Sequence, residues 1–364
     1  MYMKILSLFD GMSVAQQALK ESGFTIEKYY ASEVDQYAIA TTQSNHPETI
    51  QLGSVVGLEL NDDIDLLIGG SPCQDLSIAK SNRKGLDGER SGLFWEYLRI
   101  RDEIKPRFFI LENVASMPKE AKEEISKALG VEPVMINAGL VSAQNRKRLF
   151  WVGQLDEFRT YKQVDITQPD DMGIFLKDVL EEEVDDIYTV KNINLFRTNT
   201  KSTGSLDFIG GIKNKDWVGD GKKLSRNFPQ GDRVYSPEGK AATLSANGGG
   251  RGAKTGLYEV SGAASRTYPR TKTIGVKREK RIEIRDDGKA NSMTSVQGDS
   301  MVSEGTRIRK LTPVECLRLQ SMPDTYFDKA EIRNKPISNT QRYKMCGNAF
   351  NKEVVIHILK QLDL

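Results

Sequence analysis

Apolar residues in the first half of the chain follow two alternating patterns. Short continuous apolar runs predict buried strands, and stretches with apolar residues every three or four positions predict amphipathic helices. The predicted strands are Lys4–Phe9, Tyr29–Ser32, Asp65–Gly69, Phe108–Glu112, Val134–Asn137 and Leu149–Gly153. The predicted helices are Val14–Glu21, Val34–Asn45, Leu93–Ile104 and Lys119–Leu129. Strands separated by helices indicate an α/β fold with a doubly wound, mostly parallel sheet.

The pattern changes in the second half of the chain. An acidic stretch, Leu176–Asp186, is expected to be helical, and the regular spacing is lost soon after it. Predicted secondary structure resumes near Thr312-Pro-Val-Glu315, where a hydroxyl N-cap, a proline and a glutamate predict the start of a helix. A last helix is expected after Gly347-Asn348. We therefore predict three segments: 1–186 as the first part of the α/β domain, 187–306 as an insertion, and 307–364 as the return to that domain.

Composition narrows the class of protein. The 364 residues, 38% of them hydrophobic and 28% charged, suit a soluble globular protein with one large domain plus an insertion, or two domains. No apolar run reaches membrane-spanning length, and the first residues do not have the pattern of an export signal. Three cysteines without a C-x-x-C pair and two histidines argue against a zinc site or a disulfide framework. We expect a cytoplasmic protein without a bound metal.

The net charge of +2 conceals an uneven distribution. Residues 189–310 contain 24 of the 52 basic residues and 12 of the 50 acidic ones, a balance of +12, whereas the rest of the chain has a balance of −10. The same segment holds 17 of the 31 glycines. Such a basic, loop-rich surface favours a polyanionic partner. The alternative is an ordinary solvated charged face.

Reactive side chains follow several predicted strands. Cys73 lies in Gly-Gly-Ser-Pro-Cys-Gln after one strand, Glu112 ends the next, and Arg146 and Arg148 precede or begin a later one. Ligands of parallel sheets bind beyond the carboxyl ends of the strands. A thiol, a carboxyl and a guanidinium in this place are suited to attack a pyrimidine ring, neutralise its ring nitrogen and hold its carbonyl oxygen.

A second set of residues at strand ends suits a nucleoside ligand. Phe9-Asp10-Gly11 lies at a strand-to-helix turn, where glycine permits close approach of a ligand, but the full G-x-G-x-x-G of dinucleotide sites is missing. Glu33 ends the second predicted strand, a position from which a carboxylate can accept both hydroxyl groups of a ribose. An ordinary polar strand end is the alternative interpretation of Glu33 taken alone.

Taken in their order along the chain, the segments that carry these residues resemble the DNA (cytosine-5) methyltransferase family. The resemblance covers roughly residues 3–153 and 307–363. It is carried by Ser7-Leu-Phe9-Asp10-Gly11, Ala31-Ser-Glu33-Val34, Ser71-Pro-Cys73-Gln, Glu112-Asn-Val and Gly347-Asn348-Ala. Asp75-Leu-Ser-Ile and Arg83-Lys-Gly-Leu are similar to the animal de novo enzymes in particular. The resemblance implies a Rossmann-like class I S-adenosylmethionine-dependent methyltransferase fold, with a loop-rich target-recognition domain at 187–306.

The resemblance also implies a cofactor site for S-adenosyl-L-methionine, with S-adenosyl-L-homocysteine as the product. The implied contacts are Phe9 on the adenine, Asp10, Gly11 and Met12 at the methionine end, Glu33 on the ribose, Val34 beside the adenine, Ser54 and Val55 at the adenine edge, Pro72 and Leu93 in the wall, and Asn348 and Ala349 closing it. Ser54 departs from the family, which usually has an aspartate there. A neutral hydroxyl is expected to make a weaker hydrogen bond than a carboxylate.

For the reaction, the resemblance implies Cys73 as the nucleophile that adds to C6 of a cytosine flipped out of the duplex. Glu112 is expected at N3 and the exocyclic amine, and Arg148 at O2. Arg146 is expected on a phosphate or supporting the cysteine loop. The alternation in Arg146-Lys-Arg148 predicts that both arginines lie on one face of a strand, which favours a shared role. The alternative is that both are ordinary exposed residues at the end of an edge strand. Residues 75–92 are expected to close over DNA as a mobile loop.

The sequence is compatible with three activities. Methylation of duplex DNA is favoured because the basic insertion offers a recognition surface; transfer-RNA methylation and a catalytically inactive DNA-binding relative are the alternatives. Since the match begins within ten residues of Met1, we expect a bacterial or phage enzyme, monomeric and without membrane contact. A cognate restriction endonuclease, as in a restriction-modification system, and self-protection of a phage genome both fit.

Overall fold

The computed structural model describes residues 2–72, 92–189, 195–197, 208–212, 233–244, 257–260, 263–268, 279–284 and 307–364. Its main sheet has the order β3-β2-β1-β4-β5-β7-β6, with β8 paired to β7. The strands are β1 (Tyr2–Leu8), β2 (Thr25–Ser32), β3 (Ile50–Gln51), β4 (Leu66–Gly70), β5 (Phe108–Val114), β6 (Val134–Asn137), β7 (Lys147–Leu155) and β8 (Tyr161–Gln163). From β3 to β5 all neighbours are parallel, and β7 is antiparallel to β5, β6 and β8. The α/β, mostly parallel fold is confirmed.

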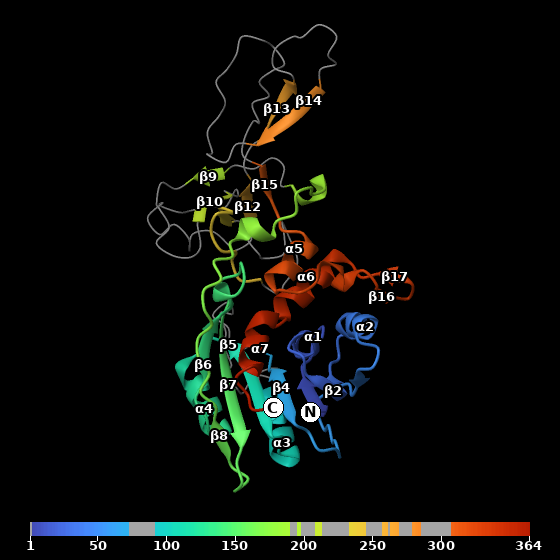
Figure 1. Ribbon diagram of the computed structural model, residues 1–364, viewed down its shortest axis with the longest axis vertical. Helices are drawn as coiled ribbons and strands as arrows, with labels where there is room; N and C mark the ends of the chain where they lie inside the picture. The colour runs from blue at the N-terminus through green and yellow to red at the C-terminus, as the bar shows by residue number, and fades with distance from the viewer. Residues whose placement is uncertain are drawn as a thin grey trace.

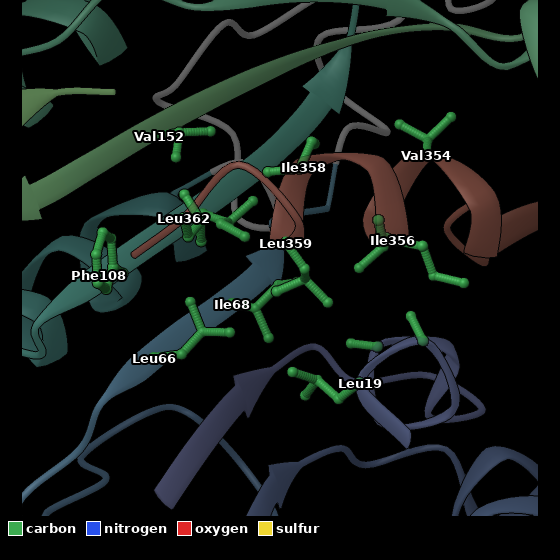
Figure 2. Close-up of a cluster of buried hydrophobic side chains, with 14 of the residues drawn as sticks. Leu19, Leu66, Ile68, Phe108, Val152, Val354, Ile356, Ile358, Leu359 and Leu362 are labelled. Atoms are coloured by element: carbon green, nitrogen blue, oxygen red, sulfur yellow. The ribbon is translucent and has the colours of Figure 1, made fainter. Parts of the chain in front are cut away.

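Helices cover both faces of this sheet because successive strand residues point to opposite sides. On one face, Ile5, Ile68 and Ile110 pack under α1 (Val14–Glu21) and α7 (Lys352–Leu359). Figure 2 shows Leu359 of α7 beside Ile68 of β4. On the other face, the neighbouring residues Leu6, Leu67 and Phe109 pack with α3 (Leu93–Ile104) and α4 (Lys119–Leu129). Two apolar layers therefore hold the sheet from both sides.

The C-terminal segment forms a third apolar cluster beside the sheet. It contains α5 (Pro313–Leu319), α6 (Asn339–Asn348) and the short hairpin of β16 (Glu331–Ile332) and β17 (Lys335–Pro336). The N-cap of α5 is Thr312, with Pro313 at the first helical position and Glu315 completing a capping box, as the sequence predicts. Helix α2 (Gln36–Asn45) packs against this segment. The segment thus returns to the α/β domain.

A second sheet has the order β15-β12-β11-β10-β9. Its strands are β9 (Leu195–Arg197), β10 (Phe208–Ile212), β11 (Arg233–Tyr235), β12 (Leu257–Val260) and β15 (Arg307–Arg309), and β13 (Ala263–Tyr268) pairs separately with β14 (Glu279–Ile284). In Figure 1 these strands lie beyond α5 and α6 from the main sheet, and both chain termini lie in the main sheet's half. The assignment of 187–306 to target recognition remains a prediction.

Residues 233–244 contact the α/β domain directly. The backbone N–H of Ala241 donates to the carbonyl of Ala143 at 2.7 Å, and the N–H of Asn145 donates to the carbonyl of Ala241 at 2.9 Å. Ala241 and Leu244 are buried in the third apolar cluster together with Leu311 and Cys316. This part of the insertion is therefore fastened to the chain immediately before β7.

Several element predictions are accurate and one is wrong. Helices α1, α3 and α4 and strand β6 have the predicted bounds. The stretch Leu176–Asp186, expected to be helical, contains only short 3-10 turns at Leu176–Val179 and Asp186–Tyr188. Its backbone is committed to tertiary partners instead, since the N–H of Glu181 donates to Glu315 Oε1 at 2.9 Å. No helix within the described residues is long and apolar enough to cross a membrane.

Candidate active site

The carboxyl ends of four parallel strands meet at one edge of the main sheet. Strands β2, β1, β4 and β5 are neighbours in that order, so Glu33, Asp10, Pro72 and Glu112 come to the same edge. Gly70, the last residue of β4, pairs with Glu112 in register. Cys73 follows Gly70 by three residues but lies outside the described residues, as do residues 74–91 of the predicted loop.

Glu112 and Arg148 form an ion pair at this edge. Arg148 Nε lies 2.8 Å from Glu112 Oε1, and the two side chains are 12% and 15% exposed for Glu112 and Arg148. The geometry follows from the sheet: Glu112 is opposite Phe150 in the antiparallel β5–β7 pair, and Arg148 lies two residues along on the same face. A carboxyl and a guanidinium are thus presented together, only partly open to solvent.

The backbone beneath this ion pair is closely packed. A Cβ atom added to Gly70 would lie 3.1 Å from Glu112 Oε2 and 3.0 Å from the Phe350 ring. Glycine therefore lets β4 pass close to Glu112, because a Cβ atom here would make the carboxyl or the ring shift by a few tenths of an ångström. Neither Gly70 nor Phe350 was among the residues expected from sequence; the Gly-Gly of the cysteine segment was the available signal for Gly70.

Asn113 fixes the chain that leads to Cys73. Its Nδ2 donates to Ser71 Oγ at 3.0 Å, and both residues are buried. Its Oδ1 accepts from the N–H of Val114 at 2.8 Å, which sets the orientation of the amide. Asn113 lies within the Glu112-Asn-Val segment, whose sequence alone predicts no role for the amide. The structure places it as the link between β5 and the end of β4.

Arg146 and Arg148 have different partners. Arg146 is 3% exposed, and its guanidinium donates to the carbonyl oxygens of Gly347 and Ala349. Arg148 instead contacts Glu112. The two arginines that the alternation places on one face therefore serve two separate contacts.

The turn after β1 contains three residues with a left-handed backbone, two of which, Phe9 and Ser13, are not glycine. Phe9, Gly11 and Ser13 have φ values of 57°, 61° and 55°, and nothing lies within 4 Å of a Cβ added to Gly11. Glu33 is held against this turn by three backbone N–H groups, those of Gly11, Val34 and Asp35, at 2.8, 2.7 and 2.8 Å. Oε1 accepts two of these bonds and Oε2 accepts one, so Oε2 keeps capacity for a further donor.

Asp10 lies beneath the same turn and points inward. Its carboxyl accepts from Tyr29 Oη at 2.7 Å and from Ser13 Oγ. Burial raises the pKa of Asp10 to about 6, against the lowering effect of these hydrogen bonds. The side chain is therefore used to hold the turn, and the open surface at this point belongs to Gly11.

The remaining residues expected at the cofactor site surround this turn or support it. Val34 is 73% exposed beside Glu33, which leaves an apolar surface free. Ser54 Oγ accepts from the N–H of Val56 at 3.1 Å. The others are Phe9 and Leu93, partly buried; Val55, Met12 and Ala349, buried; Pro72, partly buried; and Asn348, exposed. Met12 packs into the third apolar cluster, and its carbonyl accepts from Tyr326 Oη at 2.7 Å.

The two described cysteines are poor nucleophiles. Cys316 and Cys346 are completely buried, and burial raises the pKa of both thiols well above the ordinary value. Both belong to the third apolar cluster, the usual place of a free cysteine. Since a thiolate is the attacking species, neither suits covalent catalysis.

Several known proteins are similar to this chain in sequence or in fold. The family model described as C-5 cytosine-specific DNA methylase matches residues 3–363. The orphan methyltransferase M.Rho11sI of Bacillus phage rho11s is 28% identical over 99% of this chain and 97% of the relative. Among solved structures, the Entamoeba histolytica methyltransferase EhMeth has a TM-score of 0.62 at 13% identity, covering 99% of this chain and 98% of that one. The S. pombe Dnmt2 methyltransferase has a TM-score of 0.59 at 14% identity, covering 99% and 97%. At these identities the structural likeness shows the fold alone.

Proposed function

Since the chain belongs to the C-5 cytosine-specific DNA methylase family and is a DNA (cytosine-5-)-methyltransferase, we propose that it methylates a flipped-out cytosine within a specific duplex sequence through a covalent Cys73 adduct. The observation that carries the proposal is the Glu112–Arg148 ion pair, 2.8 Å across, beside the strand end that leads to Cys73. The chain thus offers Cys73 for C6 of the base, Glu112 for N3 and the exocyclic amine, and Arg148 for O2.

The residues at the sheet edge fit S-adenosylmethionine, on which the family depends. The turn leaves open space over Gly11, and Glu33 is fixed with acceptor capacity on Oε2 for a ribose hydroxyl group. Exposed Val34 offers an apolar surface for the adenine, with Ser54 at its edge. When bound, this cofactor supplies an electrophilic methyl group. The chain's own residues hold it and keep its position fixed relative to Glu112.

Cys73 is proposed to form a bond from Sγ to C6 of cytosine. Cytosine C5 is a weak nucleophile because the ring is electron-poor, and addition at C6 makes C5 enamine-like. After methylation, a water or hydroxide takes the C5 proton, the electron pair of the C5–H bond re-forms the C5–C6 double bond, and the C6–Sγ bond breaks to release the thiolate. Burial of Cys316 and Cys346 supports Cys73 as the nucleophile, because only Cys73 then remains.

Glu112 and Arg148 are proposed to hold the base during this addition. Negative charge develops at N3 when the thiolate adds, and a protonated Glu112 or a proton shared with N3 neutralises it. The same carboxyl accepts a hydrogen bond from the exocyclic amine, which thymine lacks. Arg148 donates to O2, and its positive charge also favours the thiolate form of Cys73.

Base flipping and sequence recognition complete the proposal. A cytosine stacked in a duplex cannot receive a nucleophile at C6, so it must leave the helix. The balance of +12 within 189–310 supports that segment as the DNA-reading surface. The relatives from Bacillus phages are named orphan methyltransferases, which supports an enzyme that works without a cognate endonuclease.

Transfer of a labelled methyl group to duplex DNA and to transfer RNA, assayed side by side, tests the proposed substrate. We expect label in duplex DNA, and bisulfite sequencing of that DNA should place every methylated cytosine in one short motif. Label in transfer RNA alone would contradict the proposal for DNA. Label in neither substrate, from folded protein with added cofactor, would contradict catalysis itself.

A further inference from the structure

Arg146 is buried in a place that suits neither DNA nor solvent. Arg146 is only 3% exposed to solvent, whereas the next residue, Lys147, is exposed. The guanidinium lies 2.7 Å from the carbonyl oxygen of Ala349 and 3.3 Å from that of Gly347. A phosphate contact requires a side chain that reaches the surface, and this one is covered.

The main chain of Arg146 is fixed as firmly as its side chain. Its N–H donates to Asn137 Oδ1 at 2.9 Å, and its carbonyl accepts from the N–H of Ala138 at 2.9 Å. Since both backbone groups are bonded within the α/β domain, the guanidinium is directed from a rigid base. Two residues later the same chain presents Arg148 to Glu112.

The carbonyl groups that Arg146 contacts end α6. Gly347 is in the last turn of this helix and Ala349 is its C-cap. The C-terminus of a helix carries a partial negative charge and carbonyl groups without intrahelical partners, so a buried guanidinium is well placed there. Gln320 supports the same turn from α5, donating from Nε2 to the carbonyl of Cys346 at 2.7 Å.

This turn connects two parts of the site. It carries Asn348, which is exposed, and Ala349, and it leads into Phe350, whose ring lies against Gly70 next to Glu112. Anything that moves the turn therefore moves the Phe350 ring beside the base-binding carboxyl, as well as Asn348 and Ala349.

We propose that Arg146 is a positioning residue that holds the end of α6 against the start of β7, and so couples cofactor binding at Asn348–Ala349 to the Glu112–Arg148 pair. The inference rests on the proposed function. Arg146 touches neither the base nor a phosphate; it acts through the turn that it holds.

The test compares Arg146→Met, Arg146→Lys and the neighbouring control Lys147→Ala. Calorimetric titration with S-adenosylhomocysteine should show affinity at least tenfold weaker for R146M, and within about threefold of wild type for R146K, because an ammonium group can donate to both carbonyls. K147A should bind S-adenosylhomocysteine as wild type does. Affinity for duplex DNA and its salt dependence should be unchanged in R146M.

The opposite pattern would overturn the inference. If R146M kept its affinity for S-adenosylhomocysteine while the slope of DNA affinity against salt fell by about one, Arg146 would be a phosphate contact. If R146M does not fold, hydrogen exchange of the wild type decides instead. S-adenosylhomocysteine should slow exchange at residues 146–148 as well as at 347–351, and protection confined to 347–351 would contradict the coupling.

Failure of this inference is separable from failure of the proposed function. Wild-type protein that binds no S-adenosylhomocysteine and methylates no DNA contradicts both. Wild-type protein that methylates DNA, with an R146M variant of unchanged cofactor affinity, contradicts the positioning role alone.

Discussion

Glu112 and Arg148 neutralise each other before any base arrives. Their contact at 2.8 Å lies in a place where both side chains are largely covered, so the pair is screened less than a surface ion pair. A cytosine entering between them would exchange this contact for bonds to its N3, amine and O2. The pair therefore holds the two proposed partners of the base in the orientation that the sheet imposes.

Replacing Glu112 by glutamine should remove proton transfer to N3 while keeping the shape of the side chain. We expect Glu112→Gln to bind duplex DNA normally and to lose roughly two to four orders of magnitude in methylation rate, the usual range for a proton-transfer group. Single-turnover assays measure this directly. Glu123→Gln, which affects an exposed carboxylate paired with Lys119, is the matched control and should keep the wild-type rate. A Glu112→Gln rate within threefold of wild type would mean that another group neutralises N3.

Asp10 gives the folded protein a distinct pH dependence. Its ordinary pKa is 3.8 and burial raises it to about 6, so the folded state favours the protonated form. Between these values the unfolded chain has released the proton and the folded chain has not. Stability from this group is therefore fully present below about pH 4 and is lost as the pH rises through 6.

Asp10→Asn should remove that dependence. The difference in unfolding free energy between wild type and Asp10→Asn should shift against the wild type by about 3 kcal/mol from pH 4 to pH 7, the equivalent of two pKa units. Urea unfolding at several pH values provides the measurement. Parallel curves for the two proteins would show that the Asp10 carboxyl titrates as it does in water.

At the scale of elements, sequence patterns correctly predict the helices and strands whose bounds depend on residues within or next to the element itself. Helix α4 has an apolar face, and Gly130 ends it with a φ of 76°, so its bounds follow from sequence. The stretch Leu176–Asp186 differs, because Glu181 donates to Glu315, 134 residues away. Arg146 differs for the same reason, since its carbonyl partners are 201 and 203 residues away. Spacing along one strand does not reveal contacts at that range.

Helix α5 is joined to the second sheet by a buried ion pair. Arg309, in β15, donates to both carboxylate oxygens of Glu315 at 2.7 and 2.8 Å. Glu315 also accepts from the N–H groups of Thr312 and Glu181 at 2.8 and 2.9 Å, and it is fully buried. All of its neighbours at the carboxylate are donors. The charge is therefore satisfied only as long as the whole set is present.

Glu315→Gln should destabilise the protein strongly, because it leaves the Arg309 charge buried and places an amide against donors. We expect a loss of about 3–5 kcal/mol in unfolding free energy, the usual cost of breaking a buried pair from one side. Asp324→Asn breaks the more exposed pair with Arg318 on the same helix and should cost no more than about 1 kcal/mol. Equal losses in the two variants, measured by urea unfolding, would contradict the role of burial.

For the whole molecule, the distribution of charge matches the proposed division between a DNA-reading segment and a catalytic domain. The balance is +12 within 189–310 and −10 elsewhere, and DNA affinity depends on the number of phosphate charges neutralised. The fold class followed from sequence, and so did the meeting of the candidate site residues at one edge of the sheet. The contact of residues 233–244 with the segment before β7 could not be predicted from sequence, because it depends on backbone hydrogen bonds between distant segments.

Exchanging residues 187–306 for the matching segment of a relative with another target should move the methylation motif with it. Bisulfite sequencing of DNA from cells that express the chimera reads the motif. Neutralising single lysines in the segment should lower the salt slope of DNA binding without changing the motif. A folded, active chimera that kept its original motif would place recognition outside 187–306.

Covalent capture tests the central claim, that Cys73 adds to cytosine during methyl transfer. A duplex with 5-fluorocytosine in the target motif, incubated with the protein and S-adenosylmethionine, should give an adduct that withstands denaturation, because fluorine blocks the final elimination. Peptide mapping should find the adduct on Cys73, and Cys73→Ser should bind cofactor and DNA but form none. An adduct on Cys316 or Cys346, or full methylation by the serine variant, would contradict the account.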